Sequence, residues 1–233
     1  MHWTLVISFF RYLTMLHLHR CLKSLEAQTV KPDHIVFFDN NSSFSPDVLT
    51  DEAIASFTAD GREEWYFCKH GRNDRTLSWA NNAAIRMVST EHFIFTRCDF
   101  EYAPTFCEEL LLAHQWQALS YATSWMKYGE REEKAGWQDG PSFCTSKTAM
   151  ELAGWYDETL TGWGFDQQDL QTQMMRRGVK MKVVDKFLAH HMDHPHDGMN
   201  VERAKEIWAK SPRRVRDILD EEKRLIEAKE STQ

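Results

Sequence analysis

Hydrophobic residues near the start of the chain follow two different patterns. Residues 3–10 and residues 34–38 are continuous, mostly apolar runs of strand length. Between them, residues 13–28 carry apolar side chains near helical spacing, and Lys31-Pro32 closes the connection. Continuous apolar runs are typical of strands that are buried on both faces of a parallel sheet. The order of strand, helix and strand therefore predicts a mostly parallel sheet with a right-handed crossover.

The same alternation of elements continues along the chain. Further helices are predicted at residues 47–59, 78–88 and 147–153, and further strands at residues 65–68, 92–96 and 181–184. After residue 200 the chain is strongly charged with apolar residues at helical spacing, which predicts two amphipathic helices broken near Ser211-Pro212. We therefore expect one α/β domain over residues 1–198 and a helical extension over residues 199–233.

Composition and charge exclude several classes of protein. The chain of 233 residues has a formal charge of −7 and a pI near 5.9, which argues against a basic groove for bulk nucleic-acid binding. Its five cysteines are odd in number and lack a Cys-x-x-Cys pair, which favours reduced thiols and a cytoplasmic protein. The apolar start lacks a small-residue cleavage site, and no segment approaches the roughly 18 apolar residues of a membrane span.

Acidic side chains stand at the ends of two predicted strands, where open α/β sheets bind their ligands. Asp39 follows the strand at residues 34–38, although an ordinary turn also explains the sequence around it. Asp99 and Glu101 follow the strand at residues 92–96. Two carboxylates spaced by one residue project to the same side if the backbone stays extended. Such a pair suits a hard cation that holds a diphosphate.

The segment Gly154–Leu170 concentrates glycines, aromatic rings and carboxylates within a short stretch. Glycines allow close approach of a ligand, flat tryptophan rings offer a surface for a sugar, and carboxylates can hold hydroxyl groups or accept a proton. A tight turn leading into a helix, with an aspartate in its first turn, is the structural alternative.

A cluster of four histidines and two aspartates occupies residues 190–197. A cluster of this density can bind zinc by itself, and a solvated loop is the alternative. A zinc hydrolase built on this cluster would need a water-activating carboxylate nearby, and it would leave the segment Gly154–Leu170 unexplained.

Taken together, these motifs resemble the GT-A glycosyltransferases, most closely those of family 2, with a second half of the galactosyltransferase type. The resemblance covers roughly residues 3–196 and rests on Asp39–Ser42, Ala80–Ile85, Phe93–Asp99, Gly154–Glu158 and Gly162–Asp166. It implies a mixed sheet flanked by helices and a nucleotide-diphosphate sugar as donor, with a UDP-sugar favoured. It also implies a divalent cation, Mn²⁺ or Mg²⁺, as cofactor.

The resemblance assigns donor-binding roles to several positions. Asp39 matches the residue that reads the nucleotide base, and Phe9 to Arg11 match the loop that lines base and ribose. Asp99 matches the metal-holding carboxylate of the Asp-x-Asp signature, whose first carboxylate is replaced here by Arg97. Two alternatives follow from this replacement. Either Glu101 assists Asp99 as a shifted pair, or the Arg97 guanidinium binds a phosphate directly.

Other positions complete the expected site. A histidine near the end of the fold supplies a metal ligand in several relatives, and His191 is the first match, followed by His190. Trp163 is expected to position the sugar. Arg75, in a polar loop, and Asn82, on the helix at residues 78–88, are further candidate donor contacts, with loop flexibility and helix packing as alternatives.

The expected catalytic base is a second departure from the family pattern. Inverting relatives carry Glu-Asp after the Gly-Trp-Gly turn, and the corresponding pair here is Asp166-Gln167. Because glutamine cannot accept a proton as a base, three interpretations remain open. Asp166 acts as the base, Asp169 reaches in from one turn further, or the enzyme is a retaining transferase that needs no base here.

The sequence therefore predicts a metal-dependent glycosyltransferase of the hexosyltransferase class, with the stereochemistry and the acceptor open. One alternative is another transferase that uses a nucleotide diphosphate, although such an enzyme would carry a glycine-rich phosphate loop after the first strand. The loop that follows residue 9 here lacks glycine. A second alternative is a catalytically silent nucleotide-sugar or glycan-binding protein, because Arg97 and Gln167 replace two expected carboxylates.

Overall fold

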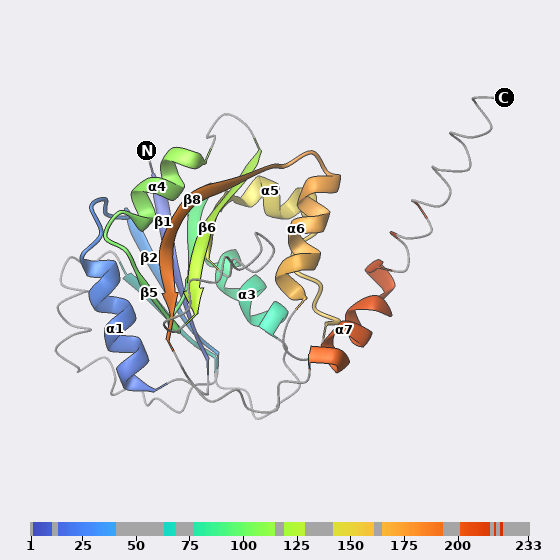
Figure 1. Cartoon of the computed structure of the whole chain (residues 1–233), viewed down its shortest axis with the longest axis horizontal. Helices are drawn as coiled ribbons and strands as arrows, with labels where there is room; N and C mark the ends of the chain where they lie inside the picture. The colour runs from blue at the N-terminus through green and yellow to red at the C-terminus, as the bar shows by residue number, and fades with distance from the viewer. Residues whose placement is uncertain are drawn as a thin grey trace.

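The apolar runs of the sequence form the centre of an eight-stranded mixed sheet in the computed structural model of the chain (Figure 1). The structure describes residues 2–10, 14–40, 63–68, 77–114, 119–128, 142–160, 165–192, 201–214, 217 and 220. The strands are β1 (Trp3–Phe10), β2 (His34–Asn40), β3 (Glu63–Cys68), β4 (His92–Arg97), β5 (Phe100–Tyr102), β6 (Ser120–Tyr128), β7 (Phe143–Ser146) and β8 (Lys180–His191). The helices are α1 (Met15–Glu26), α3 (Leu77–Arg86), α4 (Phe106–Ala113), α5 (Lys147–Ala153), α6 (Asp166–Arg176) and α7 (Val201–Ala209).

The strand order is β3-β2-β1-β4-β7-β6-β8-β5. Strand β1 pairs in parallel with β2 and β4, and β3 pairs in parallel with β2. The carboxyl ends of these four strands therefore share one edge of the sheet. Strand β7 runs antiparallel to β4 and β6, and β5 runs antiparallel to β8. The predicted mixed α/β sheet flanked by helices is confirmed.

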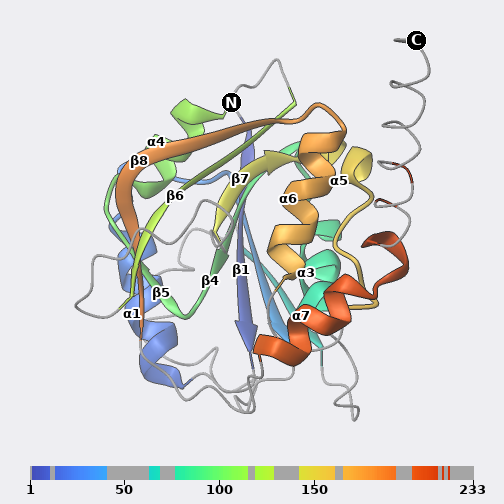
Figure 2. The same cartoon turned by 45° about the vertical axis from the view of Figure 1, so that its right-hand side comes forward.

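Two hydrophobic cores lie on opposite faces of the sheet. Along β1, Ile7 packs into one core with α1 and α4, and Val6 packs into the other with α3, α5 and α6. Figure 2 shows these two groups of helices on either side of the sheet. Successive residues of a strand point to opposite faces, so a strand buried on both faces has the continuous apolar sequence seen at β1. Among the described residues, no helix is long and apolar enough to cross a membrane.

Several elements differ from the sequence-based prediction. Strand β2 continues to Asn40, so Asp39 belongs to the strand and not to a turn. Strand β8 continues to His191, so the first part of the histidine cluster is strand and not loop. The helix expected at residues 47–59 lies outside the described residues. Helix α7 ends at Ala209, in agreement with the break expected near Ser211-Pro212.

A histidine pair, with His114 buried and His92 partly buried, lies at the opposite end of β4 from the candidate site. The His92 Nδ1 and His114 Nε2 atoms are 3.0 Å apart, and the Ser120 Oγ atom is 2.7 Å from His114 Nδ1. Burial lowers the pKa of His114 to about 4, with a smaller contribution from His92. Burial also lowers the pKa of His92. Burial therefore favours the neutral form of both rings in the folded protein.

We expect the free energy of unfolding to fall as the pH falls from 6.5 towards 4. His114 titrates near 6.5 when unfolded and at about 4 when folded, so the unfolded chain binds more protons within this window. The largest contribution is about 3 kcal/mol at 1.36 kcal/mol per pKa unit. Urea unfolding at several pH values should show this slope for the wild type and a flatter one for His114→Gln. Equal slopes would contradict the assignment.

Candidate functional site

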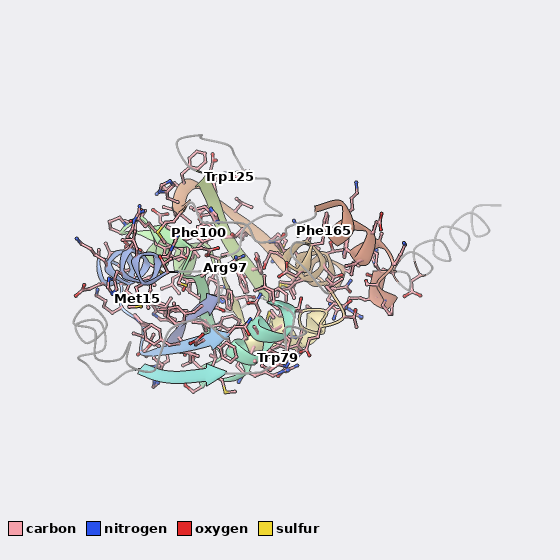
Figure 3. The ribbon with its side chains drawn as sticks, turned by 90° about the horizontal axis from the view of Figure 1, so that it is seen from below. Met15, Trp79, Arg97, Phe100, Trp125 and Phe165 are labelled. Carbon is pink, nitrogen blue, oxygen red and sulfur yellow. The ribbon has the colours of Figure 1, made fainter. Side chains whose placement is uncertain are left out.

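The candidate site lies at the carboxyl end of β4, where the chain turns into β5. The Arg97 Nη2 atom donates a hydrogen bond of 2.8 Å to Asp99 Oδ2, and the Asp99 side chain is fully buried. The His191 Nε2 atom lies 3.6 Å from the same carboxylate oxygen. Figure 3 shows Arg97 near the middle of the view, and its side chain is 13% exposed. One buried carboxylate is therefore shared by a guanidinium and an imidazole.

Hydrogen bonds to backbone groups fix this turn. The Tyr102 hydroxyl accepts a 2.9 Å bond from the Arg97 amide and lies 2.9 Å from the Arg97 carbonyl oxygen. The Met192 amide donates a 2.8 Å bond to the Asp99 carbonyl oxygen, which ties the turn to the end of β8. Arg97 and Asp99 thus sit on a rigid support, as a preorganised site requires.

Glu101 and His190 form a second pair, separate from Asp99 and His191. Arg20 donates bonds of 2.8 and 2.6 Å to the two Glu101 carboxylate oxygens, and these bonds lower the pKa of Glu101. The His190 Nδ1 atom is 3.7 Å from Glu101 Oε2. Neighbouring residues of β8 point to opposite faces, so His190 and His191 cannot reach one ion together. The four predicted metal ligands are therefore not brought together.

The turn between β4 and β5 explains why the acidic pair separates. The sequence-based prediction assumed an extended backbone from Asp99 to Glu101, but the structure has a turn at Cys98 and Asp99 before β5 begins. Glu101 is paired with His190 in the register of β5 and β8. Glu101 and Asp99 consequently have different partners.

Asp99 and His191 supply only part of the ligand set of a divalent cation. Among the residues that the structure describes, no group of three or more His, Cys, Asp and Glu is placed to hold a metal ion. Asp99 Oδ2 and His191 Nε2, 3.6 Å apart, are close enough to ligate one ion together. Mg²⁺ sites commonly use one or two protein ligands and complete the coordination with substrate phosphates. The pair therefore fits a cation that arrives with a diphosphate.

Asp166 is the first residue of α6 and lies near Arg97. The residue before it, Phe165, has a left-handed backbone with a φ of 64° and is the N-cap of the helix. Burial raises the pKa of the Asp166 carboxyl, while the charge of Arg97 and backbone N–H groups act in the opposite direction. The guanidinium of Arg97 therefore acts on Asp99 by a hydrogen bond and on Asp166 by its charge.

Gln167, next to Asp166, belongs to a buried polar network. Its Oε1 accepts a 2.7 Å bond from the Tyr156 hydroxyl, and its Nε2 donates to the Tyr121 hydroxyl. Gln171 donates a 3.1 Å bond to the same Tyr121 oxygen. The first turn of α6 is thereby anchored to β6. Sequence reasoning included Tyr156 within the segment Gly154–Leu170 but missed Tyr121, because the pairing of Tyr121 with Gln167 joins distant parts of the chain.

Asn82 holds the segment that follows α5 against α3. Its Nδ2 donates bonds to the Tyr156 carbonyl, at 3.0 Å, and to Glu158 Oε1, at 2.8 Å. Its Oδ1 accepts a 3.0 Å bond from the Tyr156 amide. The side chain is buried, and its oxygen and nitrogen both bond within the protein. The structure thus places Asn82 in a structural role and not at a free surface for the donor.

We expect Asn82→Ala to lower the free energy of unfolding by about 2–3 kcal/mol, because buried partners lose their hydrogen bonds. Asn81→Ala is the matched control on the same helix, since Asn81 is also buried and its Oδ1 has no hydrogen-bond partner among the described residues. Asn81→Ala should lower the free energy of unfolding by about 1 kcal/mol or less. Urea unfolding of both variants checks the comparison, and equal losses would argue against the anchoring role.

The other predicted site residues have varied positions. Asp169 is buried and accepts a 2.8 Å bond from Arg213 Nη1. Burial raises the pKa of Asp169, and Arg213 opposes this rise. Phe9 is buried and stacks on Phe37 with ring centroids 5.8 Å apart, and Asp39 is buried beside it in the register of β1 and β2. Predicted site residues that lie outside the described residues are Arg11, Arg75 and Trp163.

The strand order and the mixed sheet flanked by helices are those of the GT-A glycosyltransferase fold. Residues 4–174 match the family model described as Glycosyl transferase family 2, and the chain belongs to this family. No curated protein matches the chain.

Solved structures of TarS from S. aureus are similar in fold. The structure of TarS 1-349 in complex with UDP-GlcNAc gives a TM-score of 0.66 at 12% identity, covering 89% of this chain and 64% of that one. A second TarS structure gives a TM-score of 0.62 at 12% identity, covering 90% of this chain. The chain thus spans 42% of the length of that TarS chain.

Proposed function

We propose that the chain is a metal-dependent glycosyltransferase that moves a sugar from a nucleotide-diphosphate sugar to an acceptor hydroxyl. The observation that carries this proposal is the gathering of Arg97, Asp99 and His191 at the carboxyl end of β4, with Asp166 close to Arg97. A UDP-sugar is the favoured donor. TarS 1-349 was solved in complex with UDP-GlcNAc, which makes this compound the first donor to test.

The donor side of the proposed site is built on Arg97, Asp99 and His191. Asp99 and His191 would hold the divalent cation, which supplies positive charge to the leaving nucleoside diphosphate. The Arg97 guanidinium provides further hydrogen-bond donors suited to phosphate oxygens. Positive charge fixed in advance at a buried position is effective, because it needs no reorganisation as the leaving group develops charge.

The acceptor side is built on Asp166. Its carboxyl has a raised pKa, which makes it a better proton acceptor than an exposed aspartate. In an inverting displacement, Asp166 takes the proton of the acceptor hydroxyl while that oxygen forms a bond to the anomeric carbon. The bond from this carbon to the diphosphate breaks, and its electron pair leaves with the nucleoside diphosphate. Asp169 is less suited as the base, because Arg213 occupies its carboxylate.

The direct test is release of nucleoside diphosphate from UDP-, GDP-, ADP- and TDP-sugars, with manganese, magnesium or EDTA. We expect release from one donor, UDP-GlcNAc being tested first, and loss of release in EDTA. The assay needs no acceptor, because water can serve as a slow substitute. Absence of both release and a thermal shift with every donor would overturn the proposal.

A silent nucleotide-sugar binder is the second candidate function. It is favoured by Gln167, whose amide is committed to Tyr156 and Tyr121 where the family pattern has a carboxylate. A thermal shift with a donor that is never hydrolysed, with or without added metal, would identify this function.

A further inference from the structure

Three described residues after position 200, Trp208, Arg213 and Asp217, contact α6 or its N-cap, although the family match ends at residue 174. Figure 2 shows α7 beside the lower end of α6. We propose that Trp208, Arg213 and Asp217, named here the C-terminal brace, are positioning residues that hold α6 and thereby set the place of Asp166. This inference rests on the proposed function of Asp166, and it adds residues that neither the family match nor the sequence motifs include.

Arg213 joins α6 to the end of α5. Its Nη1 atom donates bonds of 2.8 Å to Asp169 Oδ2 and 2.9 Å to the Trp155 carbonyl. Its Nη2 atom donates a 2.6 Å bond to the Gly154 carbonyl. Gly154 is the left-handed C-cap of α5, with a φ of 77°, so the guanidinium also meets the negative end of that helix. One side chain therefore ties two helices together.

Arg213 also neutralises the buried charge of Asp169. Asp169 is 2% exposed and Arg213 is 14% exposed, so their ion pair is largely screened from water. A buried carboxylate that loses its partner must take up a proton or move towards solvent. Asp169 lies within the first turn of α6, as does Asp166. A shift of Asp169 would therefore displace the turn that carries Asp166.

Trp208 supports the residue that precedes Asp166. Its ring stacks on Phe165, with centroids 5.1 Å apart and planes inclined by 15°. Phe165 has a φ of 64°, a conformation unfavourable for a residue with a Cβ atom unless its surroundings hold it. Because Phe165 is the N-cap of α6, its backbone sets the direction from which the helix starts. The stack with Trp208 stabilises this backbone conformation of Phe165.

Asp217 fixes the other end of α6. Its Oδ2 accepts a 2.5 Å bond from Gln173 Nε2, and its Oδ1 lies 3.0 Å from Arg176 Nη1. The brace thus contacts α6 at its first turn and at its last turn. Contacts at both ends prevent the helix from tilting or sliding, and a small misplacement of a catalytic group is costly to the rate.

The brace is tested first with Arg213→Ala and with Arg177→Ala as the matched control. Arg177 is an exposed arginine that directly follows α6. In Arg213→Ala we expect amide hydrogen exchange over residues 165–170 to become faster and kcat to fall about 10- to 100-fold, with the donor KM nearly unchanged. Arg177→Ala should match the wild type in both measurements.

Rescue variants separate positioning from a general loss of folding. In Arg213→Ala/Asp169→Asn the unpaired buried charge is absent, so amide protection and kcat should recover in part. Arg213→Lys keeps the charge but not the two-armed geometry, so it should lie between the wild type and Arg213→Ala. If Arg213→Ala does not fold, these two variants are compared with the wild type instead. The brace would be overturned if both rescue variants showed the amide hydrogen exchange and the kcat of the wild type.

The failure of this inference and that of the proposed function are distinguishable. If the wild type turns over no donor, the proposed function fails, while hydrogen exchange over residues 165–170 still measures whether Arg213 holds α6. If the wild type is active and Arg213→Ala keeps its kcat and its amide protection, the proposed function stands and the brace is wrong. Faster exchange with an unchanged kcat would also contradict the positioning role.

Discussion

Asp99→Asn is expected to lower the rate of nucleoside diphosphate release by about 10²- to 10³-fold, the usual cost of losing one electrostatic contact to a developing charge. Asparagine keeps the size of the side chain but lacks the negative charge that holds Arg97 at 2.8 Å and faces His191 at 3.6 Å. The Arg97 guanidinium loses its charged partner, and the proposed cation would lose a ligand. Steady-state release from the preferred donor, at saturating manganese, measures the loss.

Glu101→Gln is the control for Asp99→Asn. Glu101 lies two residues after Asp99 in the chain, but its partners are Arg20 and His190. Its ion pair is partly exposed, so we expect the release rate to change by less than about threefold. An equal loss in the two variants would show that the acidic residues act together, contrary to their separation in the structure. Thermal unfolding of both variants confirms that the folded proteins are compared.

Asp166→Asn is expected to lower kcat about 10²- to 10⁴-fold, the range for removal of a general base, with little change in donor affinity. Asparagine fits the same space and cannot accept the proton. Burial raises the pKa of Asp166, so the acid limb of the wild-type pH profile should lie above the usual titration of an aspartate. Activity should fall as the pH falls through this pKa, since the protonated carboxyl is inactive as a base.

The control for Asp166→Asn is Asp185→Asn, which removes an exposed carboxylate on β8. It should keep the rate and the acid limb of the wild type. The Asp166→Asn variant should lose that limb together with most of its rate. Retention of both the rate and the pH profile in Asp166→Asn would favour a retaining mechanism or another base. The measurement needs only the donor-release assay over a range of pH.

Local patterns in the sequence were sufficient for the elements around the site. Strand β1 and helix α5 have the predicted bounds, Trp3–Phe10 and Lys147–Ala153. Strand β4 ends one residue later than expected, at Arg97. Such elements are readable because periodic burial of apolar side chains is a local property of the chain. Strand β6, Ser120–Tyr128, was not predicted, since its sequence has no continuous apolar run and its pairing with β7 and β8 is long-range.

The sequence by itself determined the class of fold, and it identified the end of β4 and the start of α6 as the places where candidate chemistry lies. Only the tertiary structure decided which side chains meet. The turn at Asp99 and the alternation along β8 separate Glu101 and His190 from Asp99 and His191. Packing between distant segments assigns Asn82 to the Tyr156 backbone and Arg213 to Asp169. These pairings depend on strand register and helix docking, which join residues far apart in the chain and leave no periodic signal in the sequence.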